Sequence, residues 1–212
     1  MFSIRCECLF ALVHPVAAEV ADPRDLLETT IETLRSNVIR DQMQITRDPN
    51  HVIKIVESVV LPHVGMRLAS QLVLDVHWKE AVPAQQDAFV DGLQHLLTRM
   101  FVGHVSHLSN ANVAYLPTEY RGNSADRAIV RTQVSREGVP KVAVNYRFHH
   151  SERSWKFYDI EIFGISLVKN YHMTLKGELC EHGLDGVIER INSGNPVPNG
   201  TATPSHGSVS AG

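Results

Sequence analysis

Gly164 and Ser166 lie where a predicted strand runs into a predicted helix. A nucleophilic serine occupies such a turn in many hydrolases. This stretch lacks the second glycine that lets the turn tighten, and the surrounding strands are predicted to be antiparallel rather than parallel. We therefore expect Ser166 to cap the helix that it begins, while Gly164 supplies the backbone freedom of the turn.

Asp159 is the carboxylate with the clearest chemical potential. It lies in a predicted strand between Tyr158 and Ile160, where an acid is costly unless it is exposed or hydrogen-bonded. In a cone-shaped α+β fold, such an acid could be the general base of a small-molecule isomerase. No His or Arg at a readable spacing joins it, which favours a structural role in which Asp159 bonds the backbone or a helix start.

The twelve histidines raise the possibility of a metal site. His104 and His107 share one face of a predicted helix, but no carboxylate lies near them on that face. His149 and His150 are neighbours on a predicted strand, so their side chains point to opposite faces. We predict no metal site and no cofactor.

The composition is that of a globular domain, with 43% hydrophobic and 20% charged residues. A net charge of -3 argues against a nucleic-acid partner, which would require a basic face. Cys6 and Cys8 are not followed by a second ligand pair at zinc-finger spacing. Cys180 is the third cysteine, so no disulfide framework is expected.

The chain is predicted to contain one domain, residues 22–193, between two terminal segments. Residues 1–21 include a short apolar core and a small-residue stretch at Val16-Ala17-Ala18, which indicates an export signal or else a disordered start. Glu7 is unusual in an export signal. Residues 194–212 contain no Asp, Glu, Lys or Arg and are rich in Gly, Pro, Ser and Thr, which predicts a disordered tail.

The first half of the domain is predicted to be helical. A capping Asp before a proline, or a proline alone, marks four helix starts, at Asp22-Pro23, Asp48-Pro49, Pro62 and Pro83. The longest helix should run from Pro83 to about residue 108. Its apolar stripe recurs at helical spacing and contains Phe89, Leu93, Leu96, Leu97, Met100, Phe101 and Val105.

The second half changes to strand periodicity. Four strands are predicted over residues 112–119, 127–135, 140–149 and 155–162, and the short turns between them imply an antiparallel meander. Two helices should follow, over residues 166–180 and 184–192, separated at Gly183. The predicted fold class is α+β, a four-stranded antiparallel meander packed on several helices, as in cystatin-like and NTF2-like folds.

Five residues carry a family resemblance through their spacing, W-x-x-x-D-x-x-x-x-G-x-S-x-x-x-N: Trp155, Asp159, Gly164, Ser166 and Asn170. This pattern resembles the signature of the MlaC or toluene-tolerance family. The similarity extends from about residue 48 to residue 192, through Leu61-Pro62, Leu72-Val73-Leu74, Trp78, Pro83, Gln86, Phe89, Leu96-Leu97 and Gly183-Leu184-Asp185-Gly186. The sequence departs from the usual pattern at Gly65, Asp75 and Leu175.

The resemblance implies a deep apolar cavity between the sheet and the helices, holding the acyl chains of a phospholipid with the headgroup at its mouth. Burying each CH₂ is worth about 0.8 kcal/mol, so two chains can be held without covalent chemistry. It further implies a monomeric, non-enzymatic periplasmic carrier. Such a carrier moves lipid between an outer-membrane lipoprotein–porin complex and an inner-membrane ABC lipid transporter, and so maintains outer-membrane lipid asymmetry.

Candidate lining residues are chosen by their periodicity and apolar character, which cannot distinguish a lined cavity from a packed core. They are Leu72, Val76, Phe89, Leu93, Leu97, Met100, Phe101, Val144, Tyr146, Phe148, Ile160, Ile162 and Leu167. Trp155, Asp159, Gly164, Ser166 and Asn170 are expected to be structural. Two alternatives stay open: an enzyme on an NTF2-like fold with Asp159 as its base, and a scaffold that binds no ligand.

Overall fold

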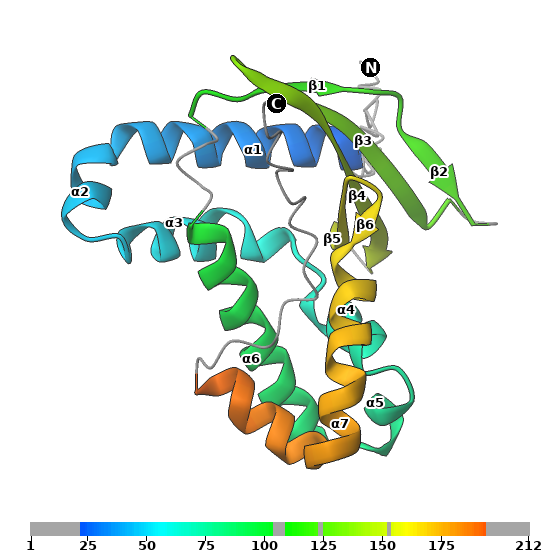
Figure 1. Ribbon diagram of the computed structural model, residues 1–212. Helices are drawn as coiled ribbons and strands as arrows, with labels where there is room; N and C mark the ends of the chain where they lie inside the picture. Colours follow the sequence, from blue (N-terminus) through cyan, green and yellow to red (C-terminus); the bar gives the residue numbers. More distant parts are fainter. Residues whose placement is uncertain (1–21, 104–108, 123–124, 152–153, 194–212) are drawn as a thin grey trace, which may run out of the picture.

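The computed structural model describes residues 22–103, 109–122, 125–151 and 154–193 (Figure 1). Helix α1 (Pro23–Arg40) begins at the predicted Asp-Pro pair. The Asp22 carboxylate accepts a hydrogen bond of 2.7 Å from the backbone N–H of Arg24, so Asp22 caps the helix. The predicted apolar face of α1 is buried, through Leu27, Ile31, Leu34 and Val38.

Two of the next helices begin later than predicted. After α2 (Gln42–Arg47), helix α3 (His51–Val59) begins three residues after Asp48, whose carboxylate accepts from the Asn50 N–H at 3.0 Å. Pro62 lies in the 3₁₀ turn η1 (Leu61–His63), and helix α4 (Met66–Leu74) begins only after Gly65. Asp75 has φ 52° and ends α4, so α5 (Val76–Glu80) is a separate helix.

Two long helices complete the helical half of the molecule. Helix α6 (Pro83–Val102) begins at the predicted proline, and the described helix ends at Gly103, before the predicted residue 108. Helix α7 (Leu167–Asn192) follows the sheet and bends at Gly183, which has φ 65° and ψ 179°. After this bend α7 packs back on α6, where Gln85 donates a 2.7 Å hydrogen bond to Asp185.

The sheet is antiparallel and has the predicted meander at its centre. Strands β3 (Arg127–Arg136), β4 (Val139–Ser151) and β5 (Ser154–Ile162) pair in sequence order. The first predicted strand is divided into β1 (Asn112–Tyr115) and β2 (Glu119–Arg121), and both pair with β3. A short sixth strand, β6 (Ile165–Ser166), pairs with β5 and leads directly into α7.

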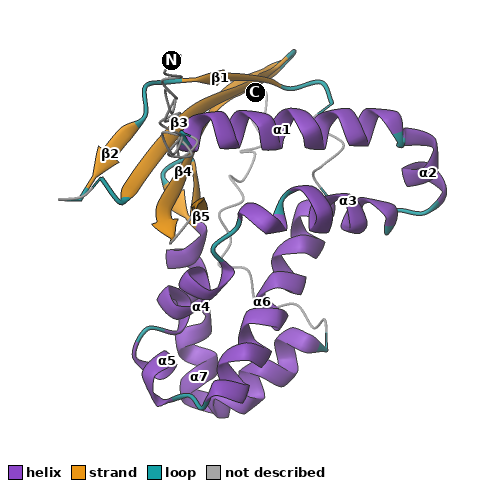
Figure 2. Cartoon of the chain, turned by 180° about the vertical axis from the view of Figure 1, so that it is seen from behind, coloured by secondary structure: helices purple, strands orange, loops and turns teal. Residues whose placement is uncertain are grey.

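The buried apolar side chains form three clusters. The helical cluster joins α4, α5, α6 and α7 around Phe89, Leu93 and Leu175. The sheet cluster joins α1 to the sheet around Val130 and Phe148, and a third cluster fills the space between α1 and α3. Both ribbon views show α1 lying along the sheet, while α4 to α7 gather at the opposite end of the molecule (Figures 1 and 2).

Several sequence predictions concern residues outside the described ranges. The terminal segments 1–21 and 194–212 are among them, together with His104, His107 and Val105. Within the described part of the chain, no helix combines the length and the apolar character needed to cross a membrane.

Candidate functional site: an apolar cavity between the helices and the sheet

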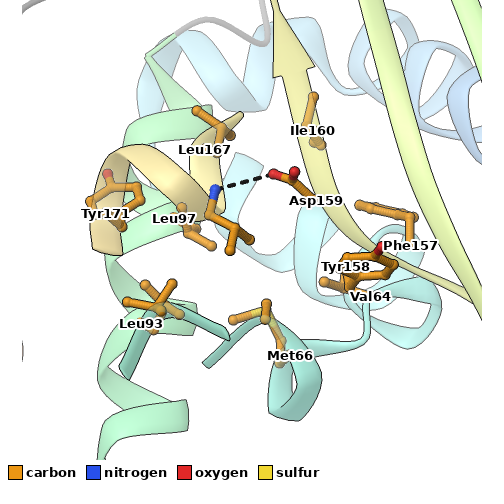
Figure 3. Close-up of a pocket in the computed structure, with 13 residues that line it drawn as sticks. Val64, Met66, Leu93, Leu97, Phe157, Tyr158, Asp159, Ile160, Leu167 and Tyr171 are labelled. Atoms are coloured by element: carbon orange, nitrogen blue, oxygen red, sulfur yellow. Dashed lines mark hydrogen bonds between the residues drawn. The ribbon is translucent and has the colours of Figure 1, made fainter. Parts of the chain in front are cut away.

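An apolar cavity lies where the helical cluster meets the sheet cluster (Figure 3). Its volume is about 60 Å³. Helices α4 and α6 and the first five residues of α7 supply most of its wall, and β5 and Val64 supply the rest. The lining residues are Val64, Met66, Ala69, Val73, Leu93, Leu97, Phe157, Tyr158, Asp159, Ile160, Leu167, Val168 and Tyr171.

An irregularity in β5 explains why four consecutive residues of one strand reach this cavity. Arg147 on β4 is paired with Asp159, but the next residue, Phe148, is paired with Phe157. Tyr158 is therefore the extra residue of a β-bulge. Because strict alternation would turn every second side chain to the other face, the bulge changes how residues 157–160 point, and all four line the cavity.

Asp159 joins the sheet to the start of α7. Its Oδ2 accepts a 2.6 Å hydrogen bond from the Ser166 hydroxyl, and its Oδ1 accepts from the backbone N–H of Val168 at 3.1 Å. The Ser166 Oγ in turn accepts from the Lys169 N–H at 3.1 Å and so caps α7. Asp159 is buried, and both of its oxygens are engaged by donors of the helix start.

Arg147 places a positive charge beside this buried carboxylate. Its Nε lies 3.3 Å from Asp159 Oδ2, and its Nη2 donates to Glu161 Oε2 at 2.6 Å. Asn145 also donates to Glu161, at 2.8 Å. Hydrogen bonds from Asn145 and Arg147 hold the pKa of the Glu161 carboxyl below its ordinary value. The arrangement is a charged network across β4 and β5, and its carboxylates are occupied by structural partners.

Two further contacts connect the helices to the sheet on the other side of the cavity. The backbone N–H of Gly65 donates to the Phe157 carbonyl at 2.8 Å, and the Lys156 ammonium donates to the Pro62 carbonyl. Gly65 is closely approached by the sheet, since a Cβ atom there would lie 2.7 Å from His149 Nε2. Polar contacts between the layers thus lie beside the cavity at Phe157 as well as at Asp159.

Four of the predicted lining residues reach the cavity: Leu93, Leu97, Ile160 and Leu167. Most of the others lie in neighbouring packing. Phe89 belongs to the helical cluster, Phe148 and Tyr146 belong to or pack against the sheet cluster, and Phe101 packs on the third cluster. Val144 is buried in β4, and Met100 accepts a 3.4 Å hydrogen bond from the Tyr171 hydroxyl through its sulfur.

The remaining three predicted lining residues, Leu72, Val76 and Ile162, are exposed, with 42%, 58% and 38% of their surface accessible. Leu72 and Val76 are exposed because α4 does not have the predicted bounds. Because α4 begins at Met66 rather than at Pro62 and breaks at Asp75, its inner face is Met66, Ala69, Ser70, Val73 and Leu74. Ile162 lies at the last position of β5, next to the exposed turn at Phe163.

Sequence reasoning missed more than half of the cavity wall. Met66, Ala69 and Tyr171 could have been found from helical periodicity once the true start of α4 and the capping role of Ser166 were fixed. Phe157 could not have been predicted to line the cavity, because its orientation depends on the bulge at Tyr158. The pairing of Arg147 with Asp159 was also missed, since it follows from the register of two strands rather than from sequence spacing.

Four of the five expected structural residues lie around the junction of β5 with α7, and Trp155 lies at the start of β5. Trp155 is buried, and its ring lies 5.1 Å from that of His150. Gly164 has φ 80° and, with Phe163, forms the tight turn between β5 and β6. Asn170 is half-buried in the first turn of α7.

The geometry offers no evident site for a bound metal ion or for Asp159 as a general base in the described residues. In the described parts of the chain, no group of three or more His, Cys, Asp or Glu side chains is placed to hold a metal ion. Among the residues that line the cavity, Asp159 is the single acid, and its oxygens bond to Ser166 and Val168. The cavity wall is otherwise apolar apart from two tyrosines, so the arrangement suits hydrophobic binding rather than proton transfer.

Comparisons with known proteins give one consistent result. The family model described as MlaC protein matches residues 28–193. A relative from Haemophilus influenzae, named intermembrane phospholipid transport system binding protein MlaC, is 23% identical over 189 residues, which is 88% of each chain. A phospholipid-binding protein from Ralstonia solanacearum, solved in complex with a phospholipid, is 26% identical with a TM-score of 0.73. That match covers 82% of this chain and 96% of the other.

Proposed function

The chain belongs to the MlaC protein family, and on that premise we propose that it binds a phospholipid and carries it between membranes. The observation that supports this most directly is the apolar cavity at the junction of the helical and sheet clusters. A bound acyl chain would contact both clusters at once. Each buried CH₂ contributes about 0.8 kcal/mol, so apolar burial alone can supply the binding energy.

The cavity must enlarge to hold such cargo. Its volume is about 60 Å³, whereas pockets that hold drug-sized ligands occupy about 300–1,000 Å³. The wall divides between two separately packed clusters, so the chains can enter if the sheet and the helices move apart. The contacts at Gly65 and Asp159 are the ones that such a movement would loosen.

The wider role that we propose is a non-enzymatic shuttle in the periplasm. The chain would receive lipid from an outer-membrane lipoprotein–porin complex and exchange it with an inner-membrane ABC lipid transporter. The named role of the Haemophilus relative in intermembrane phospholipid transport supports this role. Residues 22–193 would act as a single lipid-binding domain, and it would act as a monomer without a cofactor.

The test is to purify the protein under gentle conditions and measure bound lipid by native mass spectrometry. We expect a mass increase equal to one phospholipid, which organic extraction removes. A protein that is isolated without lipid and takes up none from phospholipid vesicles would contradict the proposal.

A matched pair of variants ties the lipid to this cavity. Ala69 lines the cavity on α4, whereas Ala84 is exposed on α6. Ala69→Leu adds side-chain volume inside the wall. Overpacking costs about 1–3 kcal/mol, so lipid loading should fall about tenfold. Ala84→Leu should load normally, and circular dichroism should show that both variants are folded. Equal loading of the two variants would place the lipid elsewhere.

A further inference from the structure

A cup that carries several charged side chains lies next to the apolar cavity and shares part of its wall. The cup has a volume of about 260 Å³, and it shares Tyr158, Asp159 and Val168 with the cavity. The rest of its lining comes from the end of α4, from β4 and from the first two turns of α7. An amphiphile with its chains in the cavity would therefore have its polar end beside this cup.

Two of the charged groups in the cup neutralise each other. Arg147 is paired with Asp159 at 3.3 Å and with Glu161 at 2.6 Å. Its charge is used within the protein, and removing it would leave buried Asp159 without its positive partner. Arg147 is therefore part of the framework rather than a group available to a ligand.

Asp75 and Lys169 are the charged groups of the cup that remain available. Both side chains are exposed, and neither forms an ion pair or a hydrogen bond with another described residue. They carry opposite charges. His172 lies in the same lining, with its Nδ1 engaged by the Val73 carbonyl at 3.0 Å. The cup thus offers one anion and one cation without a direct ion-pair partner, although Lys169 also acts on Glu161 electrostatically over a longer distance.

The backbone of Asp75 strengthens the case for a binding role. Asp75 has φ 52° and ψ −113°, a conformation that favours glycine. Holding an L-residue there costs free energy through backbone strain. Its carboxylate makes no capping hydrogen bond to α5 that would offset this cost. A strained aspartate whose exposed carboxylate lines this cup is better explained by a ligand than by folding.

We propose that this cup binds the headgroup of a zwitterionic aminophospholipid, with the ammonium on Asp75 and the phosphate on Lys169. This inference rests on the proposed function, because it requires the acyl chains to occupy the neighbouring cavity. A headgroup with a free ammonium matches both charges. A glycerol headgroup offers Lys169 the same phosphate but gives Asp75 no cation to bind.

The experiment is competitive loading from vesicles that contain equal amounts of phosphatidylethanolamine and phosphatidylglycerol with identical acyl chains. The protein is re-isolated and the bound lipids are counted by mass spectrometry. An exposed ion pair contributes up to about 1 kcal/mol, so wild type should retain phosphatidylethanolamine about threefold to fivefold over phosphatidylglycerol. Soluble phosphoethanolamine in excess should displace neither lipid.

Three variants separate the roles of the two charges. Asp75→Gly should bring the lipid ratio close to one. It should also leave the protein folded, because glycine accepts the backbone conformation. Lys169→Gln should lower the loading of both lipids and keep their ratio. Glu137→Gln, in the exposed turn between β3 and β4, should change neither quantity.

The possible results are distinguishable. If wild type and Asp75→Gly both load the two lipids equally, the headgroup inference is overturned and the proposed function stands. If wild type loads no phospholipid at all, both proposals fail. Displacement by soluble phosphoethanolamine would show that the cup serves a water-soluble ligand, which also overturns the inference.

Discussion

At the scale of single residues, the charged network of β4 and β5 is the feature that sequence spacing did not reveal. Asp159 receives two donors from the start of α7, and Arg147 faces it from the neighbouring strand. Burying a carboxylate is expensive without such partners. The network explains how an acid can be tolerated in the wall of an otherwise apolar cavity, and it accounts for Asp159 without any catalytic role.

Glu161 gives this network a measurable dependence on pH. Because its pKa is lowered in the folded protein, its contribution to stability is complete above its unfolded pKa and is lost as the pH falls through the folded value. Glu161→Gln should cost about 1 kcal/mol at pH 7, a hydrogen-bond loss reduced by partial exposure.

Urea unfolding between pH 7 and pH 3 checks this prediction. The difference between wild type and the Glu161→Gln variant should shrink as the pH falls below about 4.5, the ordinary pKa of a glutamate. Glu137→Gln, in the exposed turn between β3 and β4, should match wild type throughout. A constant difference across the range would show that Glu161 acts through packing and not through its charge.

At the scale of elements, the positions of breaks proved harder to predict than the elements themselves. The period of α1, the three meander strands and the division of the last helix at Gly183 were readable from the sequence. The break at Asp75 was not, because aspartate rarely adopts a positive φ and nothing in the local pattern requires it. That break and the late start at Met66 displaced the predicted lining residues of this helix.

The bulge at Tyr158 is a second feature of this kind. Strand alternation predicts which residues share a face only while the register is regular. The shift between Arg147 and Phe148 is set by pairing with β4, which lies outside the β5 sequence itself. Four of the thirteen residues expected to line the cavity lie in its wall, and the others were displaced where tertiary contacts override local periodicity.

The bend in α7 supplies a test at this scale, with a matched control in the same helix. Gly183 has φ 65° and ψ 179°, and a Cβ atom added there would meet no atom within 4 Å. Gly183→Ala should therefore destabilise the protein by about 1–3 kcal/mol through backbone strain alone. Gly177 has the same open surroundings but lies within the regular helix.

For Gly177→Ala we expect the opposite sign, a stabilisation of about 0.5–1 kcal/mol from the lower entropy of the unfolded chain. Free energies of unfolding from urea titrations decide between the two. If both substitutions stabilise the protein, α7 does not require the bend at Gly183.

At the scale of the whole molecule, the apolar interior is divided into clusters, and the candidate binding cavity lies between two of them. A ligand placed there would contact helices and sheet together. Anything that binds the folded state alone stabilises it by about 2.7 kcal/mol when its free concentration is 100 times Kd. Lipid loading should therefore be visible as a change in global stability.

Thermal unfolding of loaded and delipidated protein tests this expectation. For a chain of this size, each kcal/mol shifts Tm by about 2–4 °C, so loading should raise Tm by about 5–10 °C. Ala69→Leu should show a much smaller shift than Ala84→Leu, because only the first variant obstructs the cavity. A lipid that leaves Tm unchanged would be bound on the surface.

The small volume of the cavity has a consequence for release as well as for capture. Separating the two packed clusters costs free energy, and this cost offsets part of the gain from burying the acyl chains. The net affinity for lipid is therefore lower than the buried surface suggests. The protein regains this packing free energy when the clusters close after the acyl chains leave. Re-packing of the two clusters therefore favours release of the lipid, and this keeps the protein from holding its cargo irreversibly.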